Sequence, residues 1–119
     1  LGGNGEDERS TGNLCTPGTH VFYKDTLVTE HIIKSSSKTY HGNQWVHVEI
    51  EVRNDSIIKH FINGKEVLQY NKPHIGGGAV NTGDKWKPKQ NHSLKGGYIS
   101  LQSESHPVEF KNIELLELK

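Results

Sequence analysis

The sequence lacks most of the features that favour a disulfide-bonded or membrane-spanning protein. It contains no methionine and one cysteine, and only 31% of its residues are hydrophobic and 8% aromatic. A single cysteine cannot form a disulfide within the chain, so the fold must depend on packing and hydrogen bonding. No apolar run approaches the roughly 20 residues that a membrane-spanning helix needs. We therefore predict no transmembrane segment.

An excess of charge of either sign is also missing. Fourteen Lys and Arg residues balance fourteen Asp and Glu residues, and no basic run occurs. Nucleic-acid-binding domains and polybasic membrane-binding segments carry clustered positive charge. The sequence therefore predicts that nucleic acid is not a partner.

The chain is 119 residues long, which is enough for one domain. It opens with Leu1-Gly2-Gly3-Asn4-Gly5 and has neither an initiator methionine nor a signal peptide. We expect it to be a processed or excised piece of a longer protein.

The clearest pattern in the sequence is a strict alternation in residues 44–53. Val46, Val48, Ile50 and Val52 alternate there with polar residues, which is typical of a half-buried β-strand. Residues 56–62 and 65–70 are further strand candidates, and Asn63-Gly64 between them predicts a tight type I′ turn. Together these runs predict a three-stranded β-meander.

Other segments extend this pattern. Residues 20–34 could form one or two strands split near Lys24-Asp25, and residues 98–103 and 108–118 are two more strand candidates. Residues 71–97 are predicted to be a long loop insert, and loops above roughly 12–15 residues are uncommon unless functional or disordered. Five or six short strands with little helix predict an antiparallel sandwich or barrel.

Four motifs in this order are similar to those of a known family. They are Gln44-Trp45-Val46-His47-Val48-Glu49-Ile50, His60-Phe61-Ile62-Asn63-Gly64-Lys65-Glu66-Val67, Gly97-Tyr98-Ile99-Ser100-Leu101-Gln102 and Val108-Glu109-Phe110-Lys111-Asn112-Ile113. The chain resembles the 3-keto-disaccharide hydrolase family over nearly all its length. The resemblance implies an all-β fold, a concanavalin A-like antiparallel β-sandwich (jelly roll).

The same resemblance predicts how much of that domain is present. Residues 1–119 match the C-terminal portion of a single sandwich domain, and the family's N-terminal strands have no counterpart here. We therefore expect the sandwich to be incomplete at its N-terminus. The sheet edge left open is expected to pair with an N-terminal complement or with a second copy in a homo-oligomer.

The family implies action on 3-keto-glycosides, described as hydrolysis or as lyase plus hydratase activity. It also implies a carbohydrate partner and a periplasmic, secreted or cell-envelope setting in bacteria. The ketone at carbon 3 of such a sugar acidifies the hydrogen on carbon 2, and removal of that proton lets the substituent on carbon 1 leave. The reaction needs a base and an electrophile on the keto oxygen. A divalent metal ion is one candidate electrophile.

Given this chemistry, histidines and the polar face of one predicted strand supply the candidate site residues. His60 lies on an apolar strand face that is either core or a sugar-binding floor, and Glu104 is the leading carboxylate. Aromatic, amide and hydroxyl groups suit sugar binding. The predicted catalytic residues are His60 and Glu104, and the predicted substrate-binding residues are Gln102, Trp86, Tyr98, Ser100 and His20. No metal-ligand set is identified.

Two alternatives stay open at this point. A non-catalytic carbohydrate-binding module would use the same Gln, Ser, Tyr and Trp side chains without a base. A glucanase-type hydrolase would need paired carboxylates in a motif such as Glu-x-Asp-x-x-Glu, which the sequence does not contain. Cys15 has no base within the motif spacing of thiol enzymes, so we predict a structural role for it.

Overall fold

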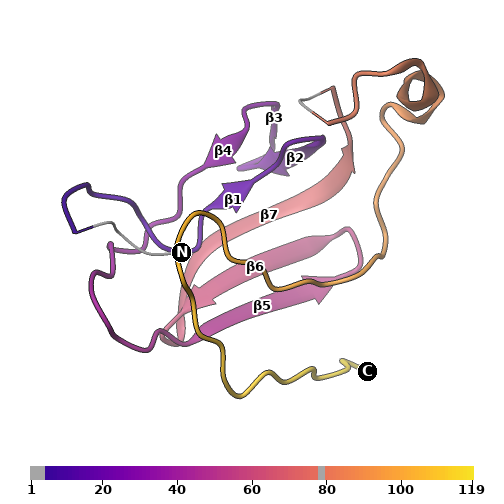
Figure 1. The fold of residues 1–119 in the computed structure, drawn as a ribbon. Coiled ribbons are helices and arrows are strands. Elements are labelled where there is room, and N and C mark those ends of the chain that lie inside the picture. The colour runs from indigo at the N-terminus through magenta and orange to yellow at the C-terminus, as the bar shows by residue number, and fades with distance from the viewer. Residues whose placement is uncertain (1–4, 78–79) are drawn as a thin grey trace.

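The computed structural model describes residues 5–77 and 80–119, and its regular structure is almost entirely β (Figure 1). The elements, in chain order, are β1 (Leu14–Cys15), β2 (Thr19–Tyr23), β3 (Thr26–Val28), β4 (Ile32–Ile33), β5 (Val48–Arg53), β6 (Ile57–Ile62), β7 (Lys65–Ile75) and the short 3₁₀ helix η1 (Asp84–Lys89). In this described part, no helix has the length and hydrophobicity needed to cross a lipid bilayer.

The larger sheet is antiparallel and has five strands in the order β3-β2-β7-β6-β5. Its β5–β6–β7 part is the meander predicted from the sequence. The predicted turn between β6 and β7 is confirmed, because Asn63 and Gly64 both have positive φ angles, 49° and 78°. The predicted split near Lys24-Asp25 is confirmed too, since these residues turn the chain from β2 into β3 with φ angles of 50° and 60°.

A second sheet of two strands, β1 and β4, packs against one face of the larger sheet. The core cluster joins the two layers: Val21 of β2 and Leu68 of β7 meet Ile33 of β4, and all three are at most 7% exposed. The antiparallel all-β character is therefore confirmed. The finer concanavalin-like sandwich stays a prediction, because the second layer contains only these two short strands.

The core face of β5 has no such cover. Val48, Ile50 and Val52 lie opposite Ile62, His60 and Ile58 of β6, so they share a face with buried residues. They are nevertheless 41%, 60% and 52% exposed. The alternation predicted a strand with its valine face buried, and that part is wrong. The reason is position, since β5 is the outermost strand and the small sheet packs over β2 and β7.

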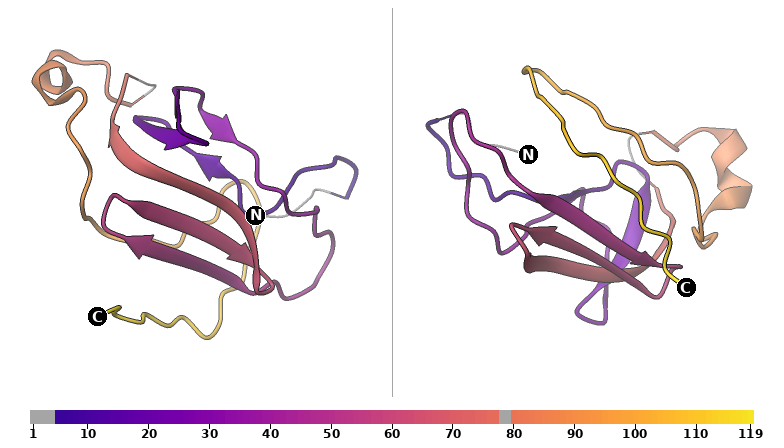
Figure 2. Two further views of the ribbon diagram at one scale, coloured as in Figure 1. Left: turned by 180° about the vertical axis from the view of Figure 1, so that it is seen from behind. Right: turned by 90° about the horizontal axis from the view of Figure 1, so that it is seen from below.

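The C-terminal segment 95–119 differs most from the sequence prediction. The strands expected at 98–103 and 108–118 are absent, and every residue of this segment is exposed. Figure 2 shows this segment running as a loop outside the sheet. A contact joins it to the rest of the chain, since Lys111 Nζ lies 4.1 Å from the ring centre of Trp45. The radius of gyration, 15.3 Å, exceeds the roughly 13.5 Å expected for a compact chain of this length. Alternating side chains favour a strand, but a strand also needs a backbone neighbour, which this segment does not have.

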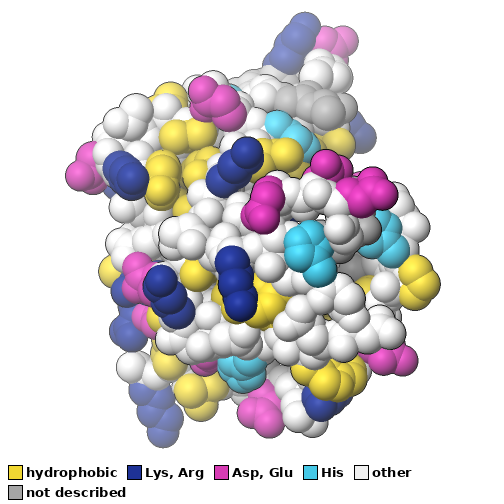
Figure 3. All heavy atoms as spheres, turned by 90° about the vertical axis from the view of Figure 1, so that its left-hand side faces the viewer, with side chains coloured by type: hydrophobic (Ala, Val, Ile, Leu, Met, Phe, Trp, Pro, Cys, Tyr) yellow, Lys and Arg dark blue, Asp and Glu magenta, His cyan; other side chains and the backbone are white. Residues whose placement is uncertain are grey.

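Charged side chains of both signs are interspersed on the surface shown in Figure 3. The exposed ion pairs include Lys59 with Glu66, at 2.9 Å, and Lys87 with Asp84, at 2.6 Å. At these two pairs, each positive side chain is therefore balanced by a negative side chain next to it.

Candidate active site at the end of strand β7

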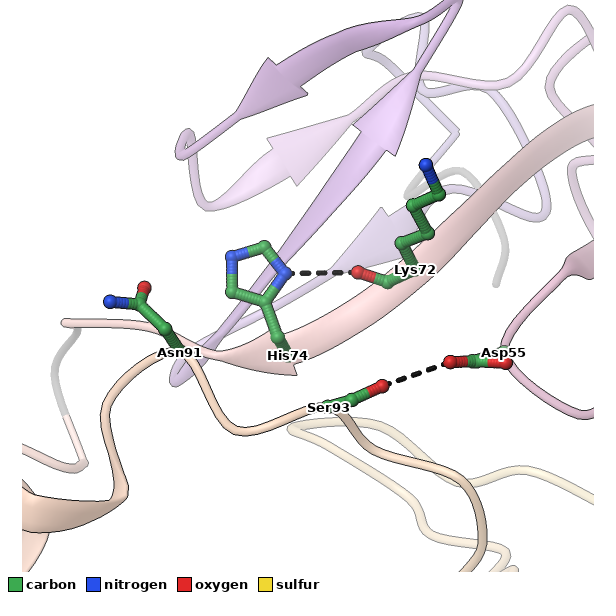
Figure 4. A pocket seen from close by; sticks show the side chains of 5 residues that line it. All are labelled: Asp55, Lys72, His74, Asn91 and Ser93. Carbon is green, nitrogen blue, oxygen red and sulfur yellow. Dashed lines mark hydrogen bonds between the residues drawn. The ribbon is translucent and has the colours of Figure 1, made fainter.

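A pocket of about 340 Å³ lies where the end of β7 meets the β5–β6 turn and the loop after η1 (Figure 4). It is lined by Asp55, Lys72, His74, Asn91 and Ser93. Small-molecule sites usually occupy about 300–1,000 Å³, so this pocket is large enough for one small ligand.

A β-bulge in β7 shapes one wall of the pocket. Phe22 pairs with Asn71 and His20 pairs with His74, so three residue steps on β7 match two on β2. The additional residue falls at Lys72-Pro73, and Lys72 adopts a left-handed conformation with φ 49°. Proline has no N–H to donate to a ladder and is tolerated at such bulges. The bulge therefore lets β7 continue through a proline as far as Ile75.

The opposite wall is a loop fixed to β7 by its backbone. Hydrogen bonds of 2.8–2.9 Å join Ile75 N to His92 O, Asn91 N to Ile75 O and Leu94 N to Pro73 O. Ser93 pairs with His74 in an isolated antiparallel bridge. Main-chain bonds therefore hold the loop that carries Asn91 and Ser93 against β7.

The ring of His74 is oriented by its own strand. Its Nδ1 is 2.9 Å from the carbonyl oxygen of Lys72, and since a carbonyl can only accept, Nδ1–H must be the donor. In a neutral imidazole the other nitrogen, Nε2, then carries the lone pair. Figure 4 shows the His74 and Lys72 side chains projecting from β7 on the same side. His74 is therefore in the tautomer that a general base at Nε2 requires.

Polar groups on the β5–β6 turn complete the pocket. The Ser93 hydroxyl donates to Asp55 Oδ2 at 2.9 Å, and the Lys72 N–H donates to the Asp55 carbonyl at 2.7 Å. Ser93 is exposed at the rim, and Asp55 is half-buried beside it. Such groups can accept from and donate to the hydroxyls of a sugar.

His20 lies beside this pocket on β2. Its ring meets that of His74 edge-on, with 5.8 Å between centroids, and its Nε2–H donates to the Gly77 carbonyl at 3.2 Å. A Cβ atom at Gly76 would overlap the His20 ring, so any larger residue at this position would have to displace the ring. Of the substrate-binding residues predicted from the sequence, His20 is the one that contacts a pocket residue.

His60 lies on the other face of the sheet. It pairs with Leu68 of the core cluster and is 8% exposed. Its Nδ1–H donates to the Gly12 carbonyl at 2.7 Å, and its Nε2 is 3.1 Å from the Tyr70 hydroxyl. Burial raises the pKa of Tyr70 to about 12, so this hydroxyl is protonated and donates to Nε2. The catalytic role predicted for His60 stays a prediction, and a substrate could reach neither ring nitrogen without displacing a partner.

The remaining predicted residues lie away from both histidines in the chain's loops. Trp86 is in η1, half-buried between Lys85 and Lys89, whose ammonium groups are 5.9 and 4.9 Å from its ring centre. The other four are exposed residues of the C-terminal segment, namely Glu104, Gln102, Tyr98 and Ser100. Across residues 5–77 and 80–119, no hydrogen bond, ion pair or ring contact joins any two of the predicted site residues. Their roles stay predictions.

The residues that do come together were missed because β7 was expected to end at Tyr70. Residues 71–97 were predicted to be a long loop insert, and His74 was assigned to it. One usable signal was the alternation of Lys72 and His74 in continuation of the strand, followed by glycines.

Metal ligands are not gathered in the described residues. No three His, Cys, Asp or Glu side chains lie close enough there to hold an ion, so the described residues do not fit the divalent metal considered from the sequence. The metal stays a prediction, and the chemistry proposed below uses the side chains of the pocket.

Comparison with models of protein families gives a match to this chain. A family model described as the 3-keto-alpha-glucoside-1,2-lyase-like domain matches residues 1–116. No curated protein and no solved structure matches the chain.

Proposed function

The chain belongs to the family of the 3-keto-alpha-glucoside-1,2-lyase-like domain, and from this premise we propose that it removes the C2 proton of a 3-keto-glycoside and releases the group on carbon 1. The orientation of His74 is the observation that carries this proposal. Its Nδ1–H is bound to a main-chain carbonyl, which leaves Nε2 to accept a proton in the pocket.

In this mechanism the base acts on a bond that the substrate itself has weakened. The ketone at carbon 3 stabilises negative charge at carbon 2 as an enolate, so a base as weak as imidazole can remove the proton. His74 accepts that proton at Nε2, and the enolate then expels the substituent on carbon 1. A positioned general base contributes about 10²–10⁴-fold to such a step.

Lys72 supplies the positive charge that the enolate oxygen needs. Its side chain projects on the same side of β7 as His74, with Nζ 5.3 Å from the Phe22 ring centre (Figure 4). An ammonium group offers three donors on a flexible stem. It can therefore swing from the Phe22 ring to the keto oxygen as charge develops there, which is the electrostatic role the reaction requires.

The rim groups hold the sugar. Asp55 and Ser93 form one hydrogen-bonded pair, and Asn91 adds an amide with both donors and an acceptor. The pocket volume of about 340 Å³ fits the lower end of the range for ligand sites. We therefore propose that one keto-sugar ring enters the pocket and that the leaving group extends into solvent.

The test compares two substrates that differ only at carbon 3. A chromogenic 3-keto-glucoside and the matching plain glucoside are incubated with the wild type, with His74→Gln and with His47→Gln. His47 is the control position, because it is exposed, directly precedes β5 and does not line the pocket. We expect release from the keto substrate alone, and a loss of about 10²-fold or more in His74→Gln but not in His47→Gln.

The other outcomes decide against parts of the proposal. Release from both glucosides would rule out ketone-dependent chemistry. Binding of both sugars without release would identify a carbohydrate-binding module instead. Equal turnover by wild type and His74→Gln would move the base elsewhere, and His60 would then be the first residue to substitute.

A further inference from the structure

The small sheet brings together a nucleophile and a base that are far apart in the sequence. Cys15 Sγ lies 3.1 Å from His31 Nε2, and both side chains are exposed. These residues lie on β1 and just before β4, apart from the residues that line the β7 pocket. Cys15 and His31 are 16 positions apart in the sequence, and the pairing of β1 with β4 brings them together.

The backbone holds the pair in register. Leu14 pairs with Ile33 and Cys15 pairs with Ile32, which places residue 31 beside the thiol. The Thr16 N–H then donates to the His31 carbonyl at 2.8 Å and extends the ladder by one step. These main-chain bonds bring the backbones of the two residues together, and their side chains make the 3.1 Å contact.

The chemistry of the pair follows from its geometry. The thiolate is the reactive form of cysteine, and an adjacent imidazole can take the thiol proton. Cys15 is the single cysteine of the chain and is not in a disulfide. Any disulfide that it forms must therefore be with another molecule.

We propose that Cys15 and His31 form a reactive thiol site that exchanges with low-molecular-weight disulfides such as glutathione disulfide. His31 takes the proton of the thiol, and the Cys15 sulfur attacks one sulfur of the disulfide. A new S–S bond joins Cys15 to one half of the reagent, while the old S–S bond breaks. The other half leaves as a thiolate and takes up the proton, so atoms and electrons balance without a further oxidant.

The site differs from an ordinary surface cysteine in one measurable respect. A free thiol is only a few per cent ionised near neutral pH. His31 Nε2 lies 3.1 Å from the Cys15 sulfur, so the imidazole can take the thiol proton as the sulfur attacks. The net expectation is a rate roughly threefold to tenfold above that of an unassisted cysteine.

The experiment follows formation of the mixed disulfide by intact mass, with glutathione disulfide at about pH 7. Wild type is compared with His31→Ala, with His92→Ala and with Cys15→Ser as a blank. His92 is a suitable control, because it is exposed and its hydrogen bonds in the described residues are made by its backbone. We expect His31→Ala to react roughly threefold to tenfold more slowly than wild type, and His92→Ala to match wild type.

A second reference keeps the test decisive if His31→Ala folds poorly. A synthetic peptide of residues 12–18 carries Cys15 in its local sequence but lacks His31. Wild type should react faster than this peptide by the same factor. Equal rates for wild type and peptide, or for wild type and a folded His31→Ala protein, would overturn the proposal.

Discussion

The half-buried Tyr70 and the buried His60 form a pair that links two neighbouring strands of the larger sheet. The Tyr70 hydroxyl is 3.1 Å from His60 Nε2, and the two rings meet edge-on with 5.3 Å between centroids. The other ring nitrogen, Nδ1, donates a hydrogen bond to the Gly12 carbonyl, so the loop before β1 is bound to the same imidazole. The pair thus ties three separate segments of the chain to one buried histidine.

This pair predicts a loss of stability at high pH. Because burial raises the Tyr70 pKa from 10 to about 12, the unfolded chain ionises first as pH rises. The stabilising contribution is complete below pH 10 and is lost as pH rises toward 12. Between about pH 8 and pH 11 the wild type should lose at most about 1.4 kcal/mol from this residue. Urea unfolding at both pH values measures the change.

Tyr70→Phe is the matched control for that measurement. It removes both the ionisation and the hydrogen bond to His60 Nε2, so it should be about 1–2 kcal/mol less stable than wild type at pH 8. The gap between the two proteins should narrow toward pH 11. A gap that stays constant or widens would contradict the sign of the effect.

A row of three paired residues tests the uncovered face of β5. Leu68, His60 and Ile50 lie side by side across β7, β6 and β5. Leu68 is 4% exposed and Ile50 is 60% exposed. We expect Leu68→Ala to cost about 2–5 kcal/mol of unfolding free energy and Ile50→Ala to cost less than about 1 kcal/mol. Chemical denaturation gives both values, and similar costs would mean that something covers β5 in solution.

The glycine beneath His20 should be sensitive to a single methyl group. A Cβ at Gly76 would overlap the His20 ring, whereas nothing lies within 4 Å of a Cβ at Gly77. Gly76→Ala should therefore displace the ring and cost about 1–3 kcal/mol, while Gly77→Ala should leave the His20 ring resonances in NMR spectra unchanged. Matching spectra for the two variants would show that the ring does not rest on Gly76.

Lys72 should affect turnover more than binding. Lys72→Met keeps the length of the side chain and removes the charge proposed to stabilise the enolate. We expect kcat on a 3-keto-glucoside to fall by about 10²–10³-fold with little change in KM. Lys95→Met, at an exposed position outside the pocket, is the control. A rise in KM at constant kcat would instead assign Lys72 to ground-state sugar binding.

One residue of the candidate site region was predicted from the sequence, and the other residues were missed for a specific structural reason. His20 was selected because it lies next to the Cys15-Pro17-Gly18 loop and could point into a cleft, and it does contact the pocket residue His74. His74 itself was missed because residues 71–97 were assigned to a loop, whereas β7 continues through Pro73 at a bulge. Composition gives no means of locating a bulge, since the additional residue depends on how β2 and β7 align.

Local sequence determined the β5–β6–β7 meander and its turns, because alternation and Asn-Gly geometry are properties of a few adjacent residues. Only the tertiary structure decided which faces are covered, since that depends on where β1 and β4 pack. It left Ile50 exposed, buried His60 and left the C-terminal segment 95–119 unpaired. It also brought Cys15 to His31 and His20 to His74, because contacts between distant residues arise from strand register.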